Sequence, residues 1–135
     1  MSVYFDRAVR YLQEQGIKYK TGDNLKLSVT YNTENLPHVC ANLFFDKEGN
    51  NLLTTRTWDI ASFKGKEEAG YAVCNELNGQ YRWGKFYLDK DSDVCFQCDA
   101  WLDEDTCGEE VLFMVRRIVG IVDGAYPKIA RARFA

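Results

Sequence analysis

The sequence predicts a single α+β domain in which three helices cover one face of an antiparallel sheet. Several segments alternate apolar and polar residues and are joined by short turns, which is typical of neighbouring antiparallel strands. Other segments carry apolar residues at helical spacing, and the combined order is α-β-β-β-α-β-β-α. Elements arranged in this way form a two-layer fold. We expect one domain over residues 1–135.

The first helix is expected over residues 3–15. Ser2 precedes it as an N-cap, and Gly16 is a left-handed stop. Residues 17–20 form either a short strand or an extended lead-in. The sequence therefore predicts that the chain enters the sheet directly after this helix.

Three strands are expected next, over residues 25–31, 39–45 and 52–60. In the first two, apolar residues alternate with polar ones, which indicates a half-buried strand. The third is rich in threonine and contains Trp58, and the pattern does not assign its inward face. The sequence thus predicts a meander of short, turn-connected strands.

A second helix is predicted over residues 66–77, closed by Asn78-Gly79. A hairpin follows at residues 82–102, with its turn at 89–93, because Asp and Ser favour turns. Alternation places Phe86 with the core on its first strand. On its second strand it predicts five core-facing residues, Val94, Phe96, Cys98, Ala100 and Leu102.

The last helix is expected to begin with a capping box formed by Thr106 and Glu109. Pro127 deletes a helical hydrogen bond, so the helix is expected to bend or restart near Asp123 and not to continue unbroken beyond Tyr126. Its apolar stripe consists of Val111, Leu112, Val115, Ile118, Val119, Val122, Ala125, Tyr126 and Ile129.

The same alternation places large aromatic side chains on the outer, non-helical face of the hairpin. Trp83, Tyr87 and Trp101 belong to this set, and Trp58 joins them if its strand presents it there. An open aromatic patch marks an association surface, whereas a helix or loop that covered it would make it part of the core. These four residues are the predicted partner-binding residues.

Composition excludes several functional classes. The net charge of −3 is spread over mixed signs, so we expect no nucleic acid and no membrane as partner. No apolar run approaches the roughly 20 residues of a membrane span, and the N-terminus lacks the apolar core of a signal peptide. Five cysteines, an odd number, fit a reducing compartment. We therefore expect a cytoplasmic protein.

Two motifs that could bind metal fail on their spacing. Cys95-x-x-Cys98 lies within a strand, where this spacing puts the thiols on opposite faces, with Cys98 in the core and Cys95 at the surface. Asp89-x-Asp91-x-Asp93 begins like a calcium loop, but Val94 and Ala100 stand where that loop needs Gly and Glu. We expect no metal and no cofactor.

No catalytic constellation is found either. The acidic run at 103–105, continued by Glu109 and Glu110, suits a helix N-terminus. His38 is the only histidine, so no nucleophile–histidine pair stands out, and no Gly-rich phosphate loop is present. The protein is not expected to be an enzyme.

Two runs of residues carry a resemblance to known proteins: Asn75-Glu76-Leu77-Asn78 and Arg82-Trp83-Gly84-Lys85-Phe86-Tyr87-Leu88-Asp89. They resemble the YbjN-like family of bacterial proteins, with the specific similarity lying between about residues 71 and 126. The resemblance implies a small, often dimeric α+β domain with a fold like that of the type III secretion chaperones. It implies a role in regulating sensory transduction and supplies no catalytic residues. The expectation of protein binding comes from the similarity of fold to those secretion chaperones.

The leading hypothesis is a non-enzymatic cytoplasmic protein-binding module, a chaperone-like or regulatory adaptor that acts as a homodimer. It would bind a protein segment on a sheet face or along an exposed edge strand, through the predicted aromatic residues. The alternative is a small-molecule-binding sensory domain, with its ligand between the helices and the sheet.

Overall fold

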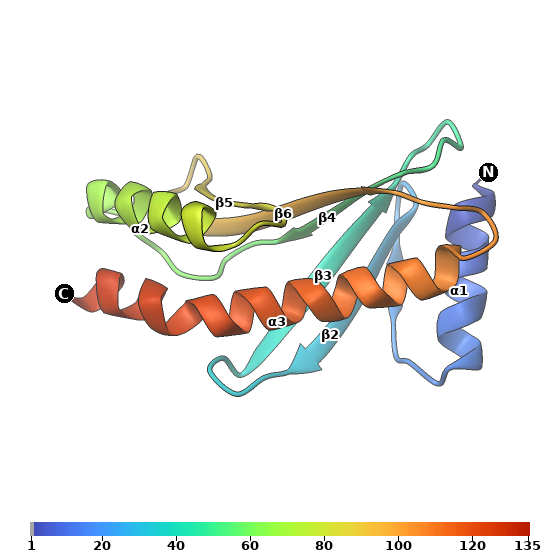
Figure 1. Cartoon of the computed structure of the whole chain (residues 1–135), viewed down its shortest axis with the longest axis horizontal. Coiled ribbons are helices and arrows are strands. Elements are labelled where there is room, and N and C mark those ends of the chain that lie inside the picture. The colour runs from blue at the N-terminus through green and yellow to red at the C-terminus, as the bar shows by residue number, and fades with distance from the viewer. Residues whose placement is uncertain (1) are drawn as a thin grey trace.

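A computed structural model describes residues 2–135, in which one six-stranded antiparallel sheet carries three helices on one face (Figure 1). The predicted fold class and element order are confirmed, and the segment after the first helix forms a short strand. The strands lie in the order β1-β2-β3-β4-β6-β5. The elements are α1 (Val3–Glu14), β1 (Lys20–Gly22), β2 (Lys26–Asn32), β3 (His38–Phe45), β4 (Leu52–Thr57), α2 (Glu67–Gln80), β5 (Lys85–Leu88), β6 (Val94–Trp101) and α3 (Cys107–Phe134).

The start of α1 follows the sequence prediction. The Ser2 hydroxyl accepts a hydrogen bond from the Phe5 N–H at 3.2 Å, which satisfies one of the free donors of the first turn. Ala8 and Leu12 are buried, and Gly16 turns the chain with φ +70°. Local capping and the apolar stripe together account for this helix.

The alternation predicted for β2 and β3 sets the register of the sheet. Leu27 lies opposite Leu43 and Val29 opposite Ala41, so their buried side chains share the helix-covered face. The next strand, β4, ends at Thr57 and not at residue 60. Asp59 adopts φ +58°, which a strand does not accommodate. The chain leaves β4 here, and the Ile60 N–H then bonds to Val94 O.

The second helix does not end where the sequence predicted. It continues through Asn78 and Gly79 to Gln80, and Tyr81 is the first extended residue after it. The Asn78 side chain hydrogen-bonds to the backbone of β5 and so does not help to terminate the helix. The expected stop at Asn78-Gly79 was wrong, because Asn78 acts in a tertiary contact.

The last helix is continuous through Pro127, so the expected restart near Asp123 and the expected end near Tyr126 were wrong. Proline leaves the carbonyl of Asp123 without its helical donor, and the Asn35 side chain donates to that carbonyl at 3.0 Å. The Asp123 carboxylate in turn accepts from the N–H groups of Asn35 and Leu36. The loop before β3 thus replaces the missing bond, and the helix runs on to Phe134.

The expected capping box is also absent from α3. Thr106 makes no side-chain capping bond; the Glu110 carboxylate instead accepts from the Asp103 N–H at 2.7 Å. The predicted apolar stripe is confirmed, since eight of its nine members are buried and Tyr126 is half-buried. Within residues 2–135, no helix combines the length and apolar character that a membrane crossing requires.

Close packing of α1 on α3 yields a first prediction. A Cβ added at Gly108 would overlap Tyr11 Cβ and Cγ and lie 2.9 Å from its Cδ1, whereas one added at Gly120 meets nothing. Gly108→Ala should therefore lower the free energy of unfolding by about 1–3 kcal/mol through overpacking. Gly120→Ala should raise it by about 1 kcal/mol through helix propensity. Urea unfolding measures both, and effects of the same sign would contradict this packing.

Candidate partner-binding groove

An apolar groove of about 580 Å³ lies between α3 and the C-terminal half of β6. In Figure 1, α3 and β6 run along each other across the molecule, and α2 lies at the left end, beside β5. The helix contributes Phe113, Met114, Arg117, Ile118 and Ile121, and the strand side contributes Cys98, Asp99, Ala100 and Trp101, with Trp83 beside them. We call this feature the groove.

Three aromatic side chains at the groove are largely exposed. Trp83 is 56% exposed, Phe113 67% and Trp101 70%. Large rings left in water on one apolar surface mark an association site. Sequence reasoning found the two tryptophans but missed Phe113, which follows the buried Leu112 and lies off the helical stripe. An apolar residue off the stripe was the signal available in the sequence.

The four predicted partner-binding residues do not all border the groove. Trp83 and Trp101 border it, whereas Trp58 and Tyr87 lie elsewhere on the open face of the sheet. By alternation along β6, the Trp101 side chain also lies on the open face, at the edge of the sheet beside the groove. Alternation along a strand describes residues within that strand, and Trp83 precedes β5 at a turn that alternation does not describe.

That turn depends on Gly84. It has φ +81°, and a Cβ added there would overlap the Phe96 ring and lie 2.7 Å from Gln97 O, so only glycine fits. Regular pairing of β5 begins at Lys85, opposite Gln97. Residues 98–101 of β6 consequently have no neighbouring strand on the β5 side.

The backbone groups of this free edge point away from β4. The Leu102 N–H bonds to Asn51 O on the β4 side. Because backbone groups alternate in direction along a strand, the N–H and C=O groups of residues 98 and 100 also point toward β4, and those of Asp99 and Trp101 point to the open side. Among residues 2–135, neither Asp99 nor Trp101 has a backbone partner there; Asp99 O receives only a 3.9 Å contact from Cys98 Sγ. An open edge therefore borders the groove.

The outer edge of β5, by contrast, is closed. Asn78 on α2 donates its Nδ2 to Phe86 O at 3.0 Å and accepts the Phe86 N–H at 2.7 Å. A side-chain amide thus takes the place of a neighbouring strand, which prevents further pairing at this edge. The sheet is blocked at β5 and open one strand further in, at β6.

The open face of the sheet has a different character. The rings of Trp58 and Phe44 lie 6.2 Å apart, and Lys26 Nζ lies 5.2 Å from the Trp58 ring and 5.9 Å from the Phe44 ring. This cation partly covers both aromatic rings from water. The register also aligns one polar row straight across all six strands: Lys20, Ser28, Asn42, Arg56, Gln97 and Lys85.

The two cysteines of the C-x-x-C motif face opposite sides of the sheet, but Cys95 is buried and not at the surface as expected. Its thiol lies 3.5 Å from Asp89 Oδ2, beneath the hairpin turn. Burial and the Asp89 charge raise the pKa of Cys95 to about 12, and burial also raises the pKa of Cys98. Both thiols stay protonated at neutral pH, which makes them poor nucleophiles and metal ligands.

The acidic turn of the hairpin is engaged with its own backbone. Asp89 Oδ1 accepts from the N–H groups of Asp91 and Asp93 at 2.9 and 3.0 Å. Burial alone would raise the pKa of Asp89, but the N–H groups of Asp93 and Asp91 and the Cys95 thiol lower it overall. In the described part of the chain, no cluster of three or more His, Cys, Asp or Glu residues could hold a metal ion.

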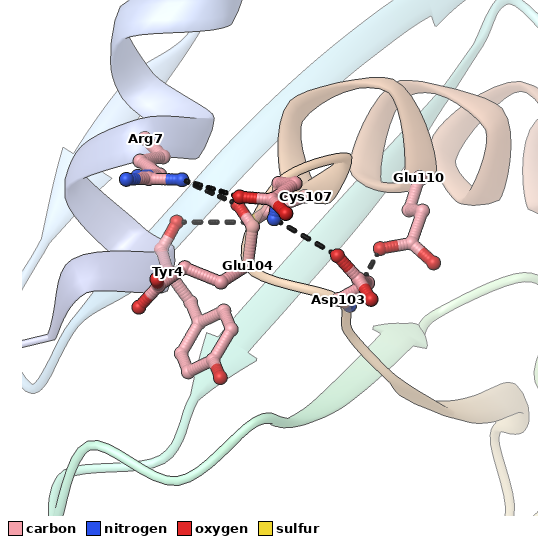
Figure 2. Close-up of polar contacts among 7 residues, drawn as sticks. Tyr4, Arg7, Asp103, Glu104, Cys107 and Glu110 are labelled. Atoms are coloured by element: carbon pink, nitrogen blue, oxygen red, sulfur yellow. Dashed lines mark hydrogen bonds and ion pairs between the residues drawn. The ribbon is translucent and has the colours of Figure 1, made fainter.

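The acidic run before α3 joins that helix to α1, as Figure 2 shows. Arg7 donates to Glu104 O at 2.8 Å and lies 3.8 Å from the Asp105 carboxylate. The Cys107 thiol donates to Tyr4 O at 3.3 Å. The run is therefore part of a structural contact, and His38, at the start of β3, is exposed and distant from it in sequence.

Comparison with known proteins identifies relatives of this fold. The family model YbjN, described as "Putative bacterial sensory transduction regulator", matches residues 7–131. The crystal structure of YbjN from E. coli, described as "a putative transcription regulator", superposes with a TM-score of 0.69 at 12% identity, over 93% of this chain and 90% of that one. At this identity the likeness concerns the fold. No curated protein matches the chain.

The closed β5 edge yields a second prediction. Asn78→Ala should lower the free energy of unfolding by about 1–3 kcal/mol, because the buried N–H and C=O of Phe86 lose their partners. Asn75→Ala, at an exposed position of the same helix, is the matched control and should change it little. Urea unfolding compares the two, and equal effects would show that the bonds to Phe86 do not stabilise the fold.

Proposed function

Because this chain belongs to the YbjN family, we propose that it is a cytoplasmic regulatory protein that acts by binding another protein, as a chaperone-like module or adaptor. The family description as a regulator supports the regulatory part of this proposal. The groove supports the binding part.

The observation that carries the proposal is the gathering of Trp83, Trp101 and Phe113 around the groove. Tryptophan is enriched among the residues that dominate binding energy at protein interfaces, and such residues act within apolar surroundings that exclude water. The helix wall between them is apolar except for Arg117. A protein segment could bury all three rings at once.

A non-catalytic role is part of the proposal. Burial raises the pKa of Cys74 and Cys107 to about 11, so neither thiol is activated for nucleophilic attack. Among the described residues that line the groove, the charged side chains are Asp99 and Arg117. A single carboxylate beside an arginine does not supply both the acid and the base of an acid–base pair.

The alternative is a small-molecule sensor that uses the same groove. Its volume of about 580 Å³ is in the range of ligand sites, and Arg117 could orient a carboxylate or phosphate. The exposed rims favour a larger partner, since a small ligand would leave Trp101 and Phe113, at 70% and 67%, in water. The two functions therefore differ in how much of the exposed aromatic surface the bound molecule must cover.

Substitution at the groove tests the leading proposal. With partners captured from cell extract and then purified, Trp83→Ala and Phe113→Ala should each weaken binding about tenfold or more, because each removes a ring that the partner buries. Tyr71→Ala, at an exposed aromatic on α2 outside the groove, is the matched control and should leave affinity unchanged. Isothermal titration measures all three.

Two results would contradict this proposal. Equal affinity of the groove variants and the control would show that partners bind elsewhere. A metabolite that raises the melting temperature of the wild type, but not of Arg117→Gln, would favour the sensor.

We also propose that the chain forms a homodimer through the open face of its sheet. There Trp58 is 39% exposed and Phe44 is half-buried, and a symmetric contact would bury both rings of each protomer. Light scattering over a dilution series should give about twice 15.6 kDa at high concentration. Trp58→Ala should shift the midpoint of the monomer–dimer transition to higher protein concentration, whereas Trp83→Ala, the control, should leave that midpoint unchanged. A single-chain mass throughout would remove the dimer and leave the groove proposal intact.

A further inference from the structure

We propose that the partner segment binds as an additional β-strand on the free edge of β6, and that it is an extended segment with alternating apolar residues and a carboxylate that meets Arg117. This inference rests on the proposed function and specifies how the groove is occupied. The occupant is a segment of another protein.

The free edge supplies the main-chain part of this site. Asp99 and Trp101 direct their N–H and C=O groups to the open side, and the described chain gives them no backbone partner. Residues 98–101 span about 13 Å of strand at about 3.3 Å per residue. An incoming strand would satisfy these groups. The Gly84 turn, where β5 begins, marks one end of the stretch of β6 with which that strand can pair.

The groove supplies the side-chain part. A strand beside β6 presents every second side chain to the helix-covered face of the sheet. There it would meet Phe113, Met114 and Ile118 of α3. The intervening side chains would lie beside Trp101, where aromatic cross-strand pairs are favourable. Apolar residues at every second position therefore fit the site, whereas a helix could not use the edge.

The charges on the helix side of the groove favour a segment that carries a carboxylate. Arg116 and Arg117 are exposed, and neither forms a salt bridge with another described residue. The other charged residue of the groove, Asp99, alternates with Cys98 and Ala100 and so presents its side chain to the open face of the sheet. Arg117 lines the groove, where a carboxylate can accept two hydrogen bonds from its guanidinium. A second copy paired edge to edge would place its own Arg116 and Arg117 on the same face of the joined sheet. Because those like charges repel, we assign the edge to a foreign segment.

Selection of peptides tests this inference directly. A library of random twelve-residue peptides is selected on the wild-type protein, and the affinity of the enriched peptides is measured by fluorescence anisotropy. We expect alternating apolar residues with Asp or Glu among them. Methylation of alternate backbone nitrogens, in the phase that faces β6, should weaken binding at least tenfold, and methylation in the other phase should weaken it less.

Asp99→Pro tests the edge from the protein side. Proline removes the N–H that points to the open side and breaks no bond to β4, so the fold should persist. Affinity for the selected peptides should fall about tenfold, whereas Asp99→Asn, which keeps the N–H, should bind as well as the wild type. If Asp99→Pro does not fold, hydrogen exchange on the wild type replaces it: the peptide should slow exchange of the Asp99 and Trp101 amides.

The outcomes separate this inference from the proposed function. If Trp83→Ala weakens the binding of none of the selected peptides, the groove proposal itself fails. If peptides bind and Trp83→Ala weakens them, but Asp99→Pro and backbone methylation have no effect, strand addition is wrong and the groove proposal stands. Enrichment of basic peptides would overturn the assigned chemistry. A dimer that Asp99→Pro dissociates would assign the edge to a second copy.

Discussion

The helices and β5 leave one part of the sheet uncovered, and this gap shapes the molecule. The long helix α3 packs against β3, α2 packs against β5, and the two helices contact each other. Because β5 begins at Lys85, opposite Gln97, the C-terminal half of β6 has no strand beside it, and no residue of α2 lines the groove there. The groove is the uncovered remainder, and its apolar floor and wall follow from the same pattern that builds the core.

The wall of the groove is held in place at both ends of α3. At its start, Arg7 and Tyr4 of α1 contact residues 104–107. At its end, Lys66 donates from Nζ to the carbonyls of Arg133 and Ala135 at 2.8 and 3.0 Å, which places a cation at the negative end of the helix dipole. The Asn35 bond to Asp123 supports the helix between these points. A helix fixed in this way offers a partner a preformed surface, and little ordering energy is lost on binding.

Local patterns predicted the elements, their order and the buried stripe of α3, because helical and strand periodicity are properties of neighbouring residues. Three of the wrong predictions have one cause, which is a side-chain contact outside the residue's own helix or strand. The Asn35 side chain bonds to the carbonyl that Pro127 leaves free, Asn78 bonds to β5 instead of ending α2, and Asp89 of the hairpin turn contacts Cys95. At the groove, Trp83 and Trp101 could be predicted as exposed aromatics, but the place of Trp83 beside the free edge of β6 follows from the Gly84 turn, which periodicity does not encode.

The residues that carry the family resemblance act together at one corner of the sheet. Asn78 closes the edge of β5, Gly84 ends the pairing of β5 with β6, and Trp83 lies over the groove that results. None of these roles is catalytic. On the open face of the sheet, cations cover the aromatic rings, whereas at the groove three rings stay exposed beside unpaired backbone groups. A corner that blocks one edge while exposing the next directs an incoming strand to a single place, and for that reason we place recognition at β6 and not on the wider face of the sheet.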